Sequence, residues 1–294
     1  MKDIIRRIAR TVVSVGLAVC LAVACTTAGR PDLSGMSFAS EPLIGKMVWH
    51  DLVTEDIDAA RRFYGGLFGW TFEESAGERG RDYLLARDGN VYVAGFVPID
   101  RPRDGTRLSR WLPYVSVPDV DDAVEKSVAA GAEVAVSARD VSIGRVAAII
   151  DPQGAVIGLA RSSVGDPDDR TTAAAPGRVV WSELIADDTA AATDFYETLV
   201  GYAPRSVERR RGTYTLLAAA GKDRAGILQN PTENWKPEWL TYFGVEDPTA
   251  ATMQAKALGG TVVLEPSPEI REGSMAVVTD PSGAVLVLQR LSGS

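Results

Sequence analysis

An internal duplication constrains the fold of this chain more than any other feature of the sequence. The stretch from Trp49 to Trp70 recurs from Trp181 to Tyr202, at an offset of 132 residues and without a gap. The shared positions are a Trp, an acid two residues later, a Leu, an Asp, a Phe-Tyr pair, a second Leu and a Gly. Solenoid units span roughly 20 to 50 residues, so this longer period predicts a duplicated domain.

Length and composition agree with two soluble domains. The 294 residues leave room for two units of roughly 150 residues each. Apolar residues make up 46% of the chain and charged residues 24%, as in ordinary globular proteins. The formal net charge of -8 argues against a nucleic acid partner, because such binding requires clustered Lys and Arg.

Residues 1–24 are typical of a bacterial lipoprotein signal peptide. Four basic residues precede an apolar run over residues 11–24, which is too short to span a bilayer comfortably. The run ends in Leu21-Ala-Val-Ala-Cys25, which resembles a lipobox and implies lipidation of Cys25. Cys20 fits less well because Val19 precedes it. An ordinary secretory signal or an uncleaved anchor is the alternative.

Lipidation predicts an exported protein held on the cell membrane or outer membrane. Several acyl chains would anchor it firmly, since each buried methylene contributes ~0.8 kcal/mol. Residues 25–44 then form a polar tether without periodicity. Removing the first 24 residues takes away four of the 31 basic residues and one of the 39 acidic residues, which leaves a net charge of -11. No disulfide within the mature domains is possible, because neither cysteine lies beyond position 25.

The remaining chain divides into a first domain over residues 45–163, a linker over residues 164–177 and a second domain over residues 178–292. Each domain contains two modules of the same order, in which a strand is followed by a helix and about three more strands. Each of the four helices begins with a capping Asp at position 56, 119, 188 or 247. Short modules of this kind predict an α+β fold.

These motifs resemble the vicinal oxygen chelate superfamily, which includes glyoxalases, extradiol dioxygenases and bleomycin-resistance proteins. The resemblance rests on Phe63-Tyr64 and Phe195-Tyr196 after the capping Asp residues, and on the turns Asp151-Pro-Gln-Gly154 and Asp280-Pro-Ser-Gly283. It covers residues 45–162 and 177–291. It implies tandem glyoxalase-like domains, each built from two βαβββ modules that curl around a cavity.

The resemblance implies a metal site, but the expected ligands are missing. Enzymes of this superfamily hold a divalent metal with His, Gln or Glu side chains on the cavity face of the strands. The six positions that can be matched carry other residues, namely Trp49, Leu112, Gly158, Trp181, Leu240 and Val287. We therefore expect no metal, no other cofactor and no catalytic residue, although a divergent metal-dependent lyase or dioxygenase using Asp51 or Glu183 remains the alternative.

The only histidine in the chain, His50, lies one residue beyond a ligand position. Side chains alternate between the two faces of a strand, so His50 is expected on the face covered by helices. A one-residue bulge would reverse this interpretation.

The same alternation predicts which side chains line the two cavities. Two aromatic residues, an apolar residue and a carboxylate face each one: Trp49, Asp51, Leu112 and Tyr114 in the first domain, and Trp181, Glu183, Leu240 and Tyr242 in the second. A carboxylate beside aromatic rings favours a cationic or aromatic small molecule. The sequence therefore predicts metal-free binding of a small molecule. In the other interpretation, the aromatic side chains fill both cavities and the protein is a non-catalytic scaffold.

Overall fold

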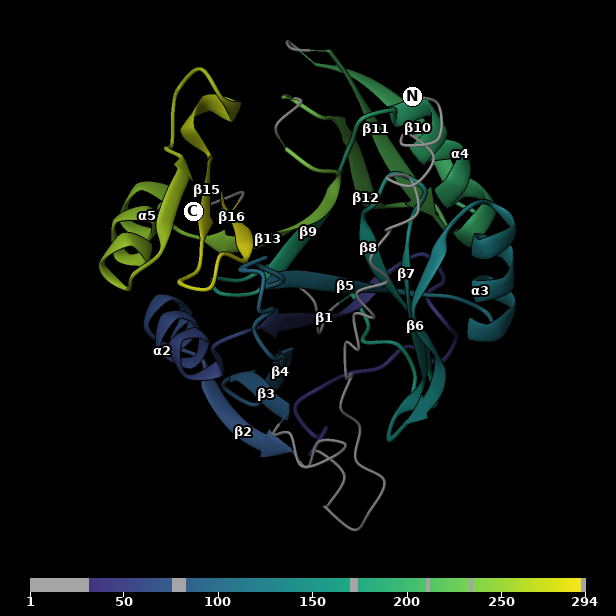
Figure 1. The fold of residues 1–294 in the computed structure, drawn as a ribbon, viewed down its shortest axis with the longest axis horizontal. Helices are drawn as coiled ribbons and strands as arrows, with labels where there is room; N and C mark the ends of the chain where they lie inside the picture. The colour runs from purple at the N-terminus through teal and green to yellow at the C-terminus, as the bar shows by residue number, and fades with distance from the viewer. Residues whose placement is uncertain (1–31, 76–82, 170–173, 210–211, 233–234, 292–294) are drawn as a thin grey trace, which may run out of the picture.

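The computed structural model describes residues 32–75, 83–169, 174–209, 212–232 and 235–291. The two halves of the chain form two eight-stranded sheets, and each sheet curls (Figure 1). The predicted α+β class and the tandem arrangement are confirmed. In this part of the chain no helix is long and apolar enough to cross a membrane.

Each sheet joins its two modules edge to edge through their first strands. The first sheet runs in the order β2 (Thr71–Ser75), β3 (Tyr83–Asp88), β4 (Val91–Pro98), β1 (Met47–Thr54), β5 (Arg110–Ser116), β8 (Val156–Ser162), β7 (Gly144–Ile150), β6 (Glu133–Val141). The second repeats this order with β10 (Ala203–Arg209), β11 (Gly212–Ala219), β12 (Lys222–Gln229), β9 (Val179–Ala186), β13 (Glu238–Val245), β16 (Val285–Arg290), β15 (Met275–Thr279), β14 (Thr261–Leu264). The central pairs β1–β5 and β9–β13 are antiparallel.

The helices begin where the capping residues predict. They are α2 (Ile57–Phe68), α3 (Val120–Ala129), α4 (Thr189–Val200) and α5 (Pro248–Ala257), with a short 3-10 turn η2 (Arg271–Gly273) after β14. In each of the four helices, the side chain of the preceding Asp accepts a backbone N–H of the first turn. Gly69 ends α2 at φ 72°, a conformation that favours glycine.

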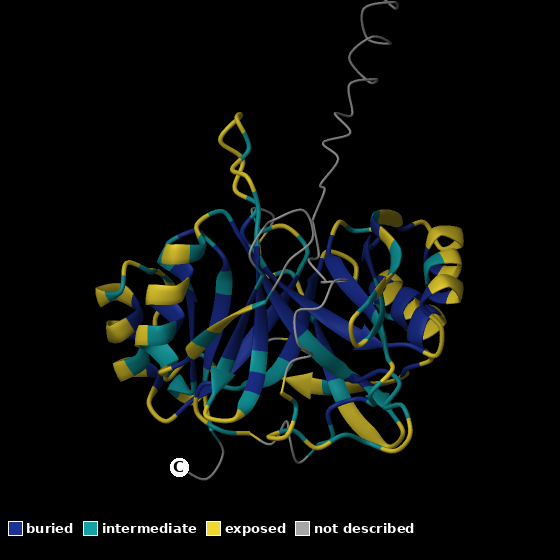
Figure 2. Cartoon of the chain, turned by 90° about the horizontal axis from the view of Figure 1, so that it is seen from below, coloured by how far each residue is buried: buried dark blue, intermediate teal, exposed yellow. Residues whose placement is uncertain are grey.

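The cores behind the helices are shared between the domains. Helix α2 contacts α5, and α3 contacts α4, so the helices pair across the domain boundary (Figure 1). One buried cluster joins Leu52 and Phe63 of the first domain to Leu286 of the second. Another joins Val115 to Phe195. Figure 2 shows the buried residues concentrated in the strands and the exposed ones on the outer faces of the helices.

Two hydrogen-bonded triads connect the domains, and both are built from the motifs that carry the family resemblance. The Tyr196 hydroxyl donates to Asp151 Oδ2 at 2.9 Å and accepts from Trp239 Nε1 at 2.8 Å. In the mirror arrangement, the Tyr64 hydroxyl donates to Asp280 Oδ2 at 3.3 Å and accepts from Trp111 Nε1 at 2.9 Å. The Phe-Tyr motif of each domain thus holds the Asp-Pro-x-Gly turn of the other.

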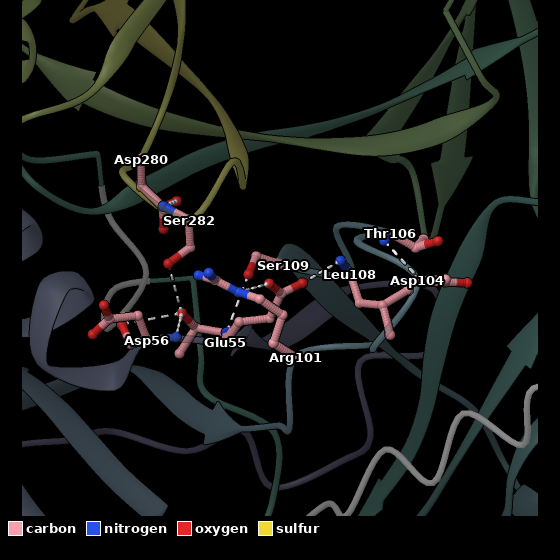
Figure 3. A network of polar contacts seen from close by, with 10 residues as sticks. Glu55, Asp56, Arg101, Asp104, Thr106, Leu108, Ser109, Asp280 and Ser282 are labelled. Carbon is pink, nitrogen blue, oxygen red and sulfur yellow. Dashed lines mark hydrogen bonds and ion pairs between the residues drawn. The ribbon is translucent and has the colours of Figure 1, made fainter.

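A polar network extends this junction at the end of β1 (Figure 3). Glu55 has a side chain only 2% exposed, and it accepts the Leu108 backbone N–H at 2.6 Å and Arg101 Nε at 3.1 Å. Thr54 Oγ1 lies 3.4 Å from Ser282 Oγ in the turn of the second domain. These contacts fix the polar loop between β4 and β5 and attach β1 to the opposite domain.

Residues 32–44, expected as part of a tether, pack against the segment that follows β8. The carboxylate of Asp166 accepts the Leu43 backbone N–H and the Ser116 hydroxyl, both at 2.7 Å, and Phe38 forms a β-bridge with Pro167. These parts of the expected tether and linker therefore belong to the folded body. The expected signal peptide and Cys25 lie outside the described residues.

Candidate functional site: the carboxylate–aromatic clusters of the two sheets

Alternation along β1 separates its polar side chains as the sequence predicts. Trp49 and Asp51 lie on the sheet face away from the helices, where Trp49 Nε1 donates to Asp51 Oδ1 at 2.8 Å. His50 lies on the other face, with Nε2 at 3.1 Å from Ser182 Oγ of β9. Irregular pairing between β1 and β5 occurs earlier, between Met47 and Trp49, so it does not reverse the side of His50.

Asp51 is buried among neutral hydrogen-bond donors. Its side chain is 2% exposed, and Oδ1 accepts from the Tyr83 hydroxyl at 2.8 Å as well as from Trp49 Nε1. Burial raises the pKa of Asp51 to about 6, and the donors from Tyr83 and Trp49 offset part of this rise. A carboxyl of this kind changes its charge close to neutral pH, which is typical of functional sites.

Tyr114 lies beside this carboxyl. Its buried hydroxyl has no partner at full hydrogen-bond geometry within the described part of the chain, but it is close enough to Asp51 to lower the pKa of that carboxyl. Its ring lies over Gly158, where an added Cβ would come within 2.2 Å of a ring carbon. Gly158 is thus required by the packing of the Tyr114 ring.

The side chains of the first domain do not fit a divalent metal. Trp49, Leu112 and Gly158 occupy the positions where the superfamily places its ligands, and none offers a metal-binding atom. Trp49 instead uses its only polar atom on Asp51, and the Tyr114 ring takes the space above Gly158. Among the described residues, no group of three or more His, Cys, Asp or Glu side chains is arranged to hold a metal ion.

The second domain repeats the cluster and neutralises its acid with an arginine. Glu183 is 1% exposed, and Arg271 Nη2 lies 2.9 Å from its Oε2. The Tyr242 hydroxyl also donates to Glu183, and the Arg271 guanidinium lies 5.5 Å from the centre of the Tyr242 ring. Trp181 Nε1 donates to the Tyr214 hydroxyl at 2.9 Å. The cluster of the second domain therefore contains its own cation, held by a carboxylate and an aromatic ring.

Sequence reasoning missed four members of these clusters. Arg139 and Arg271 stand at the same 132-residue offset as the two Trp and the two acids. Each arginine acts on the acid of its own domain, since Arg139 lowers the pKa of Asp51 and Arg271 pairs with Glu183. Extending the comparison of the two copies beyond the first helix would have found them. Tyr83 and Tyr214 stand at an offset of 131 residues, one fewer, so a gapless comparison passes over them.

The eight predicted cavity residues differ in how far solvent reaches them. The six behind the tryptophans are buried, with exposed fractions of 4% or less: Asp51, Leu112, Tyr114, Glu183, Leu240 and Tyr242. Trp49 and Trp181 are half-buried. Each cluster therefore has a filled floor of buried side chains beneath a more accessible Trp. This arrangement lies between the two sequence-based alternatives of an open pocket and a filled core.

Comparisons with known proteins agree with this architecture. Residues 178–288 match the family model described as the Glyoxalase/Bleomycin resistance protein/Dioxygenase superfamily, and residues 47–160 match the model of a Glyoxalase-like domain. The chain is similar to a protein named putative glyoxylase CFP32 of Mycobacterium tuberculosis (strain CDC 1551 / Oshkosh), with 34% identity over 84% of this chain and 95% of that protein. It is also similar to the anthracycline biosynthesis protein DnrV of Streptomyces peucetius, with 32% identity over 82% of this chain and 91% of that protein.

Solved structures with low sequence identity share the fold. The Mn(II)-bound glyoxalase of Novosphingobium aromaticivorans has a TM-score of 0.55 and 15% identity, covering 85% of this chain and 83% of its own. The 2,2',3-trihydroxybiphenyl 1,2-dioxygenase of Sphingomonas wittichii strain RW1 has a TM-score of 0.56 and 15% identity, covering 84% and 91%. With two matched domains and relatives that align over most of their length, the chain belongs to the glyoxalase/bleomycin resistance protein/dioxygenase superfamily.

Proposed function

We propose that this protein is an exported lipoprotein that binds a small cationic or aromatic molecule without metal, at the Asp51 cluster of the first domain. The observation that carries the proposal is a buried carboxyl held by neutral donors from Trp49 and Tyr83 beneath half-buried aromatic side chains. A cation approaching Asp51 would gain both an ionic contact and the faces of the aromatic rings.

The corresponding cluster of the second domain supports the proposed preference for a cation. There the guanidinium of Arg271 already lies against Glu183 and the Tyr242 ring. A carboxylate and an aromatic ring of this fold thus accommodate a planar cation.

Titration with benzamidinium, a planar aromatic cation, tests the binding site. We expect saturable binding by calorimetry to the full chain in a non-ionic detergent, and loss of most of that binding in Asp51→Asn. Glu73→Gln serves as the matched control, because Glu73 is a half-exposed carboxylate on the same sheet. Affinity should increase as pH rises through about 6, since burial raises the pKa of Asp51 to about 6 and only the ionised form attracts a cation.

Two results would overturn the proposed binding. One is equal benzamidinium binding by the wild-type protein and Asp51→Asn, which would place the ligand elsewhere. The other is a stoichiometric divalent metal in the purified protein, measured by elemental analysis, which would favour a metal-dependent enzyme instead.

The anchor has a separate test. The proposed acylation at Cys25 rests on the Leu21-Ala-Val-Ala-Cys25 stretch and the basic and apolar segments before it. Intact-mass measurement of the mature protein should show acyl chains on a first residue Cys25, and Cys25→Ala should be recovered without them. An unmodified mature protein that begins elsewhere would contradict the lipoprotein assignment.

A further inference from the structure

A cavity lies between the two domains, along the first residues of β1 and β9. Its volume is about 210 Å³, and strands of both domains line it. These two strands lie in the middle of the molecule (Figure 1). The lining includes Trp49 and Trp181 but neither Asp51 nor Glu183, so the cavity adjoins the clusters described above without containing their acids.

The cavity has apolar walls and one cationic end. Met36, Met47 and Val93 are among the apolar side chains that line it. The charged end contains Lys46 and Arg224, whose side chains are only 7% and 8% exposed. Long cationic side chains rarely remain this deeply buried without an anion, so the charges around them decide what the cavity accepts.

Charged side chains from both domains meet at this end. Asp169 pairs with Lys46 at 3.0 Å and with Arg224 at 2.9 Å, and it also contacts the more exposed Lys222. Asp168 adds a second negative charge near Lys46. This end of the cavity therefore presents buried cations to a ligand.

Arg224 also has hydrogen-bonding capacity left over. Its Nη1 contacts Asp169, but its Nε–H is buried and has no acceptor within the described part of the chain. A buried guanidinium N–H without an acceptor is costly, and a carboxylate oxygen supplies the acceptor that Arg binds best. At the other end, His50 Nε2 and Ser182 Oγ lie 3.1 Å apart, so these two lining side chains satisfy each other.

We propose that the interdomain cavity binds a small monocarboxylate with an apolar or aromatic body. The carboxylate lies at Arg224 and Lys46, and the body occupies the space between Met47 and Val93. A phosphate dianion fits less well, because the walls are apolar. The site joins residues of both domains, so binding also holds the domains together.

The single histidine of the chain makes the test direct. Burial lowers the pKa of His50 to about 3, so its ring stays neutral and its NMR signal does not move with pH between 5 and 8. Protein labelled at histidine, purified as the full chain in non-ionic detergent and without a histidine tag, gives one ring resonance from the cavity. Benzoate is the probe, and we expect a saturable shift of that resonance.

Three comparisons make the outcome decisive. Arg224→Gln should weaken benzoate binding roughly tenfold or more, because it removes a charged hydrogen-bond donor. Asp51→Asn should leave benzoate binding unchanged, which separates this site from the one proposed for cations. Benzamidinium and inorganic phosphate should not saturate a shift of the His50 signal in the concentration range of benzoate.

The proposal is overturned if benzoate leaves the His50 signal of the wild-type protein unchanged, if Arg224→Gln binds it as well as the wild type, or if phosphate acts equally. Since Arg224→Gln can fail to fold, Val93→Phe offers a second variant that fills the apolar wall and retains the ion pairs. It should also abolish the shift, and unchanged binding in that variant would equally overturn the site.

Discussion

Tyr196→Phe tests whether the cross-domain triads hold the two domains together. The change removes one oxygen atom that both donates to Asp151 Oδ2 at 2.9 Å and accepts from Trp239 Nε1 at 2.8 Å. Tyr196 is fully buried and Trp239 is 3% exposed, so water cannot replace either bond. Losing a donor to a buried carboxylate and leaving a buried indole N–H unpaired should destabilise the protein by about 3 kcal/mol.

Urea unfolding, followed by tryptophan fluorescence and circular dichroism, measures this loss. With an m value of about 3 kcal/mol/M for a protein of this size, the midpoint should fall by about 1 M. Tyr92→Phe is the matched control, because the Tyr92 hydroxyl donates at 2.9 Å to Glu73, whose side chain is 47% exposed. There the loss should be about 1 kcal/mol or less. Equal shifts for the two variants would refute the argument that the triad is a buried junction.

Two further predictions concern buried groups described above. Burial raises the pKa of Asp280 to about 6. Because the folded state then binds this proton more tightly than an unfolded chain with a pKa of about 3.9, stability should increase as pH falls from about 6 to about 4. Asp280→Asn should reduce that increase in the free energy of unfolding by up to about 3 kcal/mol, measured by urea unfolding at both pH values. A variant with the same pH dependence as the wild type would contradict this prediction. Gly158→Ala should cost about 1–3 kcal/mol in thermal or urea unfolding, because its Cβ would meet the Tyr114 ring at 2.2 Å. Gly65→Ala in α2, where the nearest side-chain atom, on Phe72, is 3.4 Å away, should instead stabilise by roughly 0.5–1 kcal/mol; a cost at both positions would count against the packing argument.

Local signals were sufficient to predict most of the fold. The four capping Asp residues mark the helix starts because their side chains satisfy free backbone N–H groups, an interaction within a few residues of sequence. Strands β1 and β9 could be located because apolar and polar residues alternate along them. By contrast, strands β2 and β10 carry no such local signal, since most of their residues are exposed and do not alternate.

Contacts between distant residues could not be predicted in the same way. Tyr64 and Asp280 were recognised as motif residues, but nothing local indicates that they meet across the domain boundary. The pairing of Arg271 with Glu183 also requires the fold, because the two residues are 88 positions apart. Which side chains share one face of a strand can be predicted from the sequence, because alternation is a local property. Whether side chains fill the space enclosed by the sheet cannot be predicted from local sequence, because it depends on how aromatic rings from three strands pack.

The shared cores also set the order in which the chain can finish folding. Leu286 and Leu288 belong to the same buried cluster as Leu52 and Phe63, so the first domain needs strand β16 of the second domain to cover its helix. Synthesis proceeds from the N-terminus, so β16 is added after every strand of the first domain. The first half must therefore wait with its apolar helix face uncovered, and a chain without β16 would lose the cover of its first domain as well as the strand that joins β13 to β15 in the second sheet.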